Sequence, residues 1–128
     1  RFHECTIGHA WVPEFGDPDK LSDFEFLIKY SPLHNVMIPA EGTRQYPSIM
    51  LLTGDHDDRV SPLHTFKFVA ELQSTFCSGA DSKQTNPIVA RIETRAGHGR
   101  MPTALVIDEI ADVMSFIAAT VGAEWKLK

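Results

Sequence analysis

Hydrophobic residues recur along this chain with two different periods, and the two periods alternate. In residues 18–30, 62–73 and 102–119, apolar side chains return every three or four positions, which is typical of one buried face of a helix. Residues 48–54 and 88–94 are short apolar or β-branched runs, which favour strands buried on both faces. Strands that alternate with helices indicate an α/β fold in which the two strands pair in parallel.

The segments between these elements carry turn signals rather than a period. Asp17-Pro18 combines a capping side chain with the fixed φ of proline, which predicts a helix start at this point. Residues 1–16 mix histidine, tryptophan and phenylalanine without a clear period, so we expect irregular structure there. Residues 31–47 and 74–87 are predicted to be loops because they are rich in proline, glycine or polar residues.

The predicted sheet needs neighbours that this chain does not supply. Two parallel strands with apolar residues on both faces leave faces and edges that a few helices cover incompletely. We therefore expect residues 1–128 to be part of a larger α/β domain.

Composition excludes several classes of protein. The 128 residues include 12 Lys+Arg and 17 Asp+Glu, and the net charge of -5 offers no basic surface for nucleic acid. No apolar run approaches the roughly 18 residues that a membrane-spanning helix needs. The hydrophobic fraction of 43% is ordinary for a globular core. The two cysteines, Cys5 and Cys77, suit a reducing compartment better than a disulfide scaffold.

Titratable residues gather directly after both predicted strands, where α/β proteins place their functional groups. The first strand leads into a charged turn that contains Asp57, and the second leads into a glycine-flanked turn around His98. One strand–helix–strand crossover separates the two turns, so we expect them to lie side by side. An acid followed by a histidine is the second half of an α/β-hydrolase triad, in which the carboxylate orients the imidazole that activates a serine.

Other interpretations of these residues stay open at this level. A histidine beside glycine is also typical of an ordinary loop, and the acidic cluster 55–58 suits a solvated turn or a metal site. Because no HExxH motif or ordered spacing of oxygen ligands is present, we predict no metal. No serine lies in a Gly-x-Ser-x-Gly motif, so the nucleophile of a hydrolase would have to lie outside these residues.

Four motifs, in the same order along the chain, resemble the C-terminal part of the prolyl oligopeptidase family. They are Thr6-Ile7-Gly8-His9-Ala10-Trp11, Lys29-Tyr30-Ser31-Pro32-Leu33-His34-Asn35-Val36, Asp55-His56-Asp57-Asp58-Arg59-Val60 and Ala96-Gly97-His98-Gly99. The resemblance implies the last part of an α/β-hydrolase domain in a cytoplasmic serine peptidase that cleaves short peptides after proline. It also implies a β-propeller and a serine-bearing segment elsewhere in the protein, and no cofactor. This chain alone is therefore expected to be inactive.

The resemblance assigns three polar residues to the reaction. Asp57 matches the triad acid and His98 matches the triad base. Arg59 matches the arginine that holds a substrate carbonyl next to the proline. From the residues alone, Arg59 could equally form a surface ion pair with Asp58, which would contribute little to stability.

The resemblance also assigns three residues to a proline pocket, namely Trp11, Val60 and Phe15. The family usually has tyrosine at the position of Phe15, so the apolar wall is kept and one hydroxyl is lost. Proline lacks an N–H and presents a flat apolar ring, so an aromatic and aliphatic pocket suits it. Without the resemblance, Trp11 would be interpreted as a core aromatic residue.

Two further functions are compatible with the sequence. One is another oligopeptidase or an acyl-peptide hydrolase of the same fold. The other is a non-catalytic α/β segment that serves as an interaction module or belongs to a pseudoenzyme. The remaining histidines are left without a functional role: His3, His9, His34, His56 and His64.

Overall fold

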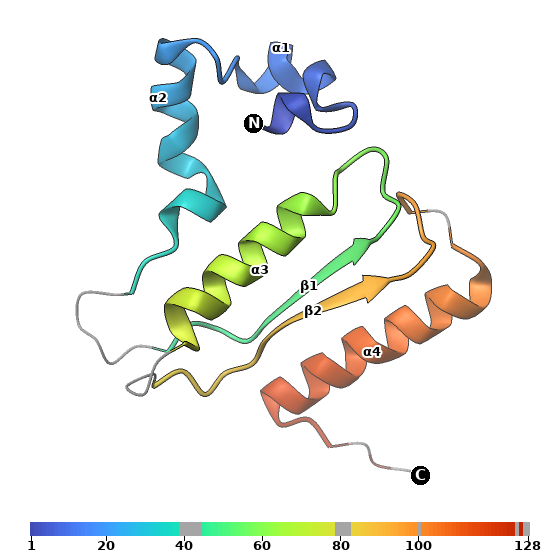
Figure 1. The fold of residues 1–128 in the computed structure, drawn as a ribbon. Helices are drawn as coiled ribbons and strands as arrows, with labels where there is room; N and C mark the ends of the chain where they lie inside the picture. Colours follow the sequence, from blue (N-terminus) through green and yellow to red (C-terminus); the bar gives the residue numbers. More distant parts are fainter. Residues whose placement is uncertain (39–44, 79–82, 100, 125, 127–128) are drawn as a thin grey trace.

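Two parallel strands lie between two helices in the computed structural model, which describes residues 1–38, 45–78, 83–99, 101–124 and 126. Figure 1 shows a crossover helix on one face of the sheet and the C-terminal helix on the other. The four elements are β1 (Ile49–Gly54), α3 (Leu63–Phe76), β2 (Ile88–Glu93) and α4 (Thr103–Val121). The predicted α/β architecture with parallel pairing is confirmed, and every predicted element is found to within three residues at each end.

The register of the sheet places the ends of both strands level with each other. Ile49 pairs with Ile88 at one end, and Gly54 pairs with Glu93 at the other. Because the strands are parallel, the loops that follow them leave from the same edge of the sheet.

The core lies between the sheet and α3. Leu72, Phe76 and Ile88 form its buried cluster, and Leu72 is completely inaccessible to solvent. The ring of Tyr46 stacks on Phe76 with 4.3 Å between centroids. Further apolar side chains pack partly buried against this cluster: Val36, Ile49, Leu51, Phe68 and Val69.

α4 is joined to the other face of the sheet by charged side chains. The Arg91 guanidinium on β2 donates to the Asp112 carboxylate at 2.7 Å and lies 3.6 Å from that of Glu109. The same guanidinium donates to Glu93 at 2.8 Å, and these interactions raise the pKa of Arg91, with Asp112 as the largest contributor. Arg91 therefore fixes the place of α4 beside the strand that leads to His98.

Burial of the strands on both faces is an expectation that this chain does not meet. Leu52, Val89 and Ile92 are 42%, 38% and 44% exposed. The physical reason is that α3 and α4 cover only part of a two-stranded sheet.

The N-terminal region contains short helices, so the expected irregular structure at residues 1–16 is wrong. The helices of this region are η1 (Phe2–Glu4), η2 (Gly8–Trp11), α1 (Val12–Phe15), α2 (Leu21–Tyr30) and η3 (Pro32–Asn35). The first three are too short to show a helical period. They depend on local bonds such as that from the Gly8 N–H to the Cys5 carbonyl at 2.8 Å.

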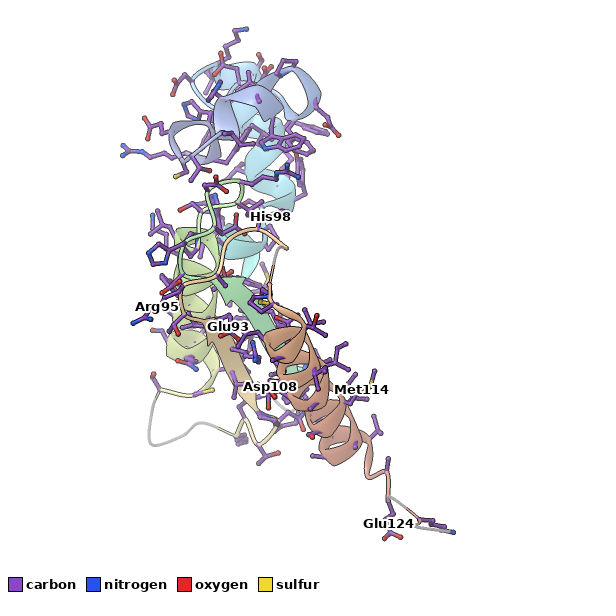
Figure 2. The ribbon with its side chains drawn as sticks, turned by 90° about the vertical axis from the view of Figure 1, so that its right-hand side faces the viewer. Glu93, Arg95, His98, Asp108, Met114 and Glu124 are labelled. Carbon is purple, nitrogen blue, oxygen red and sulfur yellow. The ribbon has the colours of Figure 1, made fainter. Side chains whose placement is uncertain are left out.

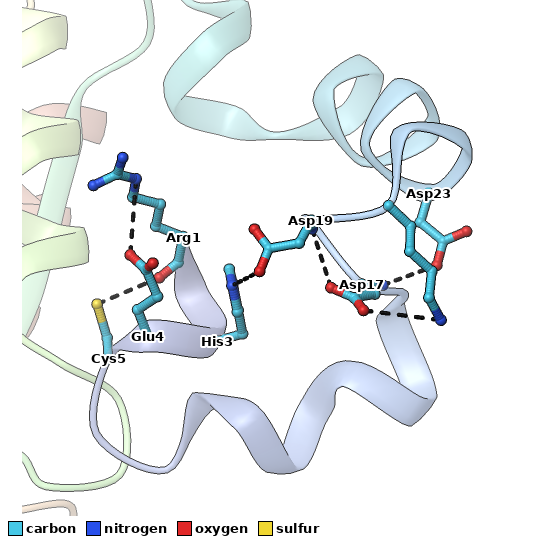
Figure 3. A network of polar contacts seen from close by, with 8 residues as sticks. Arg1, His3, Glu4, Cys5, Asp17, Asp19 and Asp23 are labelled. Atoms are coloured by element: carbon cyan, nitrogen blue, oxygen red, sulfur yellow. Dashed lines mark hydrogen bonds and ion pairs between the residues drawn. The ribbon is translucent and has the colours of Figure 1, made fainter.

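α2 begins at Leu21 rather than at the predicted start, because the chain before it forms a turn stabilised by side chains. Asp17 accepts the Asp19 N–H at 3.0 Å, and Asp23 in α2 accepts the Asp17 N–H at 2.9 Å. The His3 ring reaches Asp19 at 3.1 Å and so connects η1 to this turn (Figure 3).

Both predicted loops are shorter than expected. η3 occupies part of residues 31–47, and α3 continues to Phe76. Residues 39–44 and 79–82 of these loops lie outside the described residues. Of the described helices, none combines the length and apolar character needed to cross a bilayer.

Candidate active site

The site begins where the two strands end, and backbone hydrogen bonds hold the two loops against each other. The Asp55 N–H donates to the Glu93 carbonyl, and the His56 N–H donates to the Ala96 carbonyl, both at 3.0 Å. The approach is so close at Gly54 that a Cβ there would lie 2.4 Å from the Ala96 oxygen. Figure 2 shows His98 just beyond this point, past Glu93 and Arg95 at the end of β2.

Asp57 and His98 face each other across the two loops. The Asp57 Oδ2 lies 2.8 Å from the His98 Nδ1. The Asp57 side chain is 11% exposed, whereas that of His98 is 42% exposed. The carboxylate is therefore shielded behind the imidazole, and the ring remains accessible to a molecule from outside.

The second oxygen of Asp57 is held by its own loop. Oδ1 accepts the N–H groups of Arg59 at 2.9 Å and Val60 at 2.8 Å. Burial raises the pKa of Asp57, but the Val60 N–H, the His98 ring and the Arg59 N–H outweigh it, so the pKa lies below its ordinary value. Asp57 is thus a fixed carboxylate that stays charged near neutral pH.

The neighbouring acid and histidine form a separate pair. The His56 Nδ1 lies 2.6 Å from the Asp55 Oδ1, which also accepts the Ala96 N–H at 3.3 Å. The His56 ring is the largest cause that lowers the pKa of Asp55. Asp55 thereby fastens the end of β1 to the turn that precedes His98.

Among the residues that the structure describes, no group of three or more His, Cys, Asp or Glu side chains is arranged to hold a metal ion. The carboxylates of Asp55 and Asp57 instead contact different histidine rings, and Asp57 also accepts a hydrogen bond from a backbone N–H group.

The four residues assigned to substrate binding line one cavity of about 280 Å³: Trp11, Phe15, Arg59 and Val60. The rings of Trp11 and Phe15 lie 6.3 Å apart, and Phe2 meets Phe15 edge-on at 6.1 Å. Trp11 is 37% exposed in this chain and lies outside the buried cluster formed by Leu72, Phe76 and Ile88.

Arg59 also departs from its alternative role. Within the described part of the chain, its guanidinium forms no ion pair with Asp58. Arg59 is instead one of the residues that line the cavity, as is its neighbour Val60.

Five further residues line this cavity, and no pattern in the sequence assigned them to it: Phe2, Cys5, Thr6, Gly8 and His64. His64 belongs to the first turns of α3, and the others precede or begin η2. The only signal that could have indicated them is that Thr6 and Gly8 stand in the same motif as Trp11.

Comparison with known sequences places the chain beside peptidases. Residues 1–124 match the sequence model described as the Prolyl oligopeptidase family. Prolyl oligopeptidase A of Galerina marginata (strain CBS 339.88) is 43% identical over 127 residues, which cover 98% of this chain and 16% of that protein. Prolyl endopeptidase of Dictyostelium discoideum is 43% identical over 125 residues, which cover 97% of this chain and 16% of that protein. The chain thus spans about one sixth of the length of these relatives.

The solved structures that resemble this chain come from the same kind of peptidase as the similar sequences. Prolyl oligopeptidase B from Galerina marginata, bound to a 35mer hydrolysis and macrocyclization substrate, gives a TM-score of 0.84 at 33% identity, covering 98% of this chain and 16% of that one. A structure from a study of two prolyl endopeptidases gives a TM-score of 0.79 at 36% identity. The match covers 100% of this chain and 16% of that one. Substrate-bound structures of the Galerina marginata protein carry alanine in place of a serine, an aspartate or a histidine.

Proposed function

Because this chain belongs to the prolyl oligopeptidase family, we propose that it is the C-terminal part of the catalytic domain of a serine peptidase that cleaves short peptides on the carboxyl side of proline. The observation that carries the proposal is the 2.8 Å contact between Asp57 and His98 at the ends of neighbouring parallel strands.

The contact suits an acid–base pair that activates a serine. With Nδ1 directed at Asp57, His98 presents its Nε2 to a serine hydroxyl supplied from outside this chain. Nε2 takes the hydroxyl proton while the serine oxygen attacks the peptide carbonyl, and later gives that proton to the leaving amine. Asp57 holds the tautomer and stabilises the imidazolium between these steps.

The cavity that the loop after Asp57 helps to line suits a proline residue. Trp11, Phe15 and Val60 offer flat aromatic and aliphatic walls to a ring that has no N–H to satisfy. Arg59 offers a charged donor for the carbonyl next to that ring. Because Arg59 and Val60 donate their N–H groups to Asp57, one loop joins the pocket wall to the catalytic acid.

The remainder of the protein supplies what this chain lacks. In our proposal the nucleophilic serine, most oxyanion donors and a β-propeller that limits access to short peptides lie elsewhere, so residues 1–128 alone are inactive. We place the protein in the cytoplasm, which accords with the family resemblance and with Cys5 and Cys77 as free thiols.

Two reporter peptides test the proposal on the full-length protein, one cleaved after Gly-Pro and the other after Gly-Ala. We expect kcat/KM to be about 100-fold higher for Gly-Pro, and a fluorophosphonate that labels active serines should abolish both rates. Equal rates on the two reporters would instead identify another oligopeptidase of this fold. Absence of turnover and of labelling would identify a pseudoenzyme or an interaction module.

A further inference from the structure

Thr6 adopts a backbone conformation that its side chain disfavours. Its φ is 49°, in the left-handed region, where a β-branched residue is a genuine outlier. Such a conformation persists only where the surrounding structure imposes it, and it often marks a functional constraint. The left-handed backbone of Thr6 therefore needs a specific structural explanation.

Local bonds enclose this residue within a tight turn between two short helices. The Cys5 N–H donates to the Phe2 carbonyl at 3.1 Å, and the Gly8 N–H donates to the Cys5 carbonyl at 2.8 Å. Gly8 is buried so close to η1 that a Cβ there would lie 1.8 Å from the Phe2 oxygen. The turn at Thr6 consequently determines where η2 starts, and η2 ends at Trp11.

The Thr6 hydroxyl makes a long-range contact from this turn. Its Oγ1 donates to the Arg59 carbonyl at 3.1 Å, across 53 positions of sequence. Thr6 and Arg59 both line the cavity that contains Trp11 and Val60. The bond therefore joins the cavity wall formed by the N-terminal segment to the wall formed by the loop after β1.

The same loop is already fastened to the catalytic acid, because Asp57 accepts the N–H groups of Arg59 and Val60. A continuous series of hydrogen bonds thus runs from Thr6 through Arg59 to Asp57. We propose that Thr6 is a positioning residue that sets the spacing between Trp11 and Arg59 and thereby the affinity for proline. This inference rests on the proposed function, since it names a residue that adjusts the same pocket.

Substitutions of Thr6 in the full-length protein separate the hydroxyl from the backbone. Thr6→Val keeps the branched shape and loses the donor, Thr6→Ser keeps the donor, and Thr6→Gly relieves the backbone but loses the donor. For the Gly-Pro reporter we expect Thr6→Val and Thr6→Gly to raise KM about fivefold, the scale of one lost hydrogen bond, with kcat within about twofold. Thr6→Ser should match the wild type.

A threonine outside the cavity provides the matched control. The Thr120 Oγ1 on α4 donates to the Ile117 carbonyl at 3.0 Å, so Thr120→Val removes the same kind of bond. We expect KM to be unchanged in this variant. A lower melting temperature of Thr6→Val with wild-type KM would show a merely structural role and overturn the inference, as would a wild-type KM in Thr6→Gly.

A binding measurement keeps this test separate from the test of the proposed function. In a His98→Ala background, calorimetry with N-acetyl-Gly-Pro-amide reports the pocket without turnover. If the wild type fails to cleave the reporter, the proposed function fails, yet affinity about fivefold weaker in Thr6→Val would still support the role of Thr6. Equal affinity for the peptide in His98→Ala and in His98→Ala/Thr6→Val, or no binding to either protein, would contradict the role of Thr6.

Discussion

At the scale of single residues, the two carboxylate oxygens of Asp57 make different contacts. Oδ2 faces the His98 ring, while Oδ1 accepts the N–H groups of Arg59 and Val60. The Asp57 carboxylate therefore cannot rotate away from the imidazole without losing its hydrogen bonds to the N–H groups of its own loop. The orientation of His98 and the shape of the pocket wall therefore depend on one side chain.

The lowered pKa of Asp57 predicts how its contribution to stability changes with pH. An aspartate in the unfolded chain has a pKa of about 3.9, and in the folded protein the pKa of Asp57 is lower. As the pH falls, the unfolded chain takes up the proton first, so the stabilisation is present above about pH 4 and is lost below it. Comparing melting temperatures of full-length wild type and Asp57→Asn should show a difference that shrinks between about pH 5 and about pH 2. A difference that grows over this acid range would contradict the assignment.

Only part of this residue-level arrangement could be predicted from the sequence. The pairing of Asp57 with His98 follows from the crossover, which brings the ends of parallel strands together whatever the loops contain. The bond from Thr6 to Arg59, and the presence of Phe2 and His64 in the cavity, depend on how the N-terminal segment lies against the loop after β1 and the start of α3. No period or spacing in the chain encodes that placement.

At the scale of elements, the long apolar segments were predictable and the single turns were not. α3 and α4 carry several repeats of a helical period, and β1 and β2 are short apolar runs between turn signals. η1 contains three residues and η2 four, less than two turns each, so neither is long enough to show a helical period, and both depend on single local bonds such as that from Gly8 to Cys5. The short helices are nevertheless the elements that bring Trp11 to the cavity.

The close approach of the two strand ends predicts an asymmetry between two glycines. At Gly54 a Cβ would lie 2.4 Å from the Ala96 oxygen, whereas at Gly97 the nearest atom would be 3.7 Å away. Gly54→Ala must therefore push the loops apart and lengthen the contact between Asp57 and His98. We expect kcat/KM of the full-length protein to fall about 100-fold in this variant, and to stay within about threefold of wild type in Gly97→Ala. Similar losses in both variants would show that the strand ends do not set the geometry of the pair.

At the scale of the whole molecule, the described surface carries apolar side chains that an independent domain would bury. One face of α4 is about half exposed along its length, at Ile107, Ile110, Met114 and Ile117, and the sheet is similarly open at Leu52 and Ile92. Apolar side chains that gather on one exposed face are typical of a contact surface. With a chain that spans about one sixth of its relatives, they support our proposal that the rest of the hydrolase domain packs here.

Replacement of one histidine in the full-length protein, with kcat measured on the Gly-Pro reporter, tests directly whether His98 is the base. His98→Ala removes the imidazole that faces Asp57, and His56→Ala is the matched control because His56 pairs with Asp55. We predict that kcat falls by about four orders of magnitude in His98→Ala with a modest change in KM, and stays within a few-fold of wild type in His56→Ala. A wild-type kcat in His98→Ala would show that Asp57 and His98 do not form the acid–base pair of a serine peptidase.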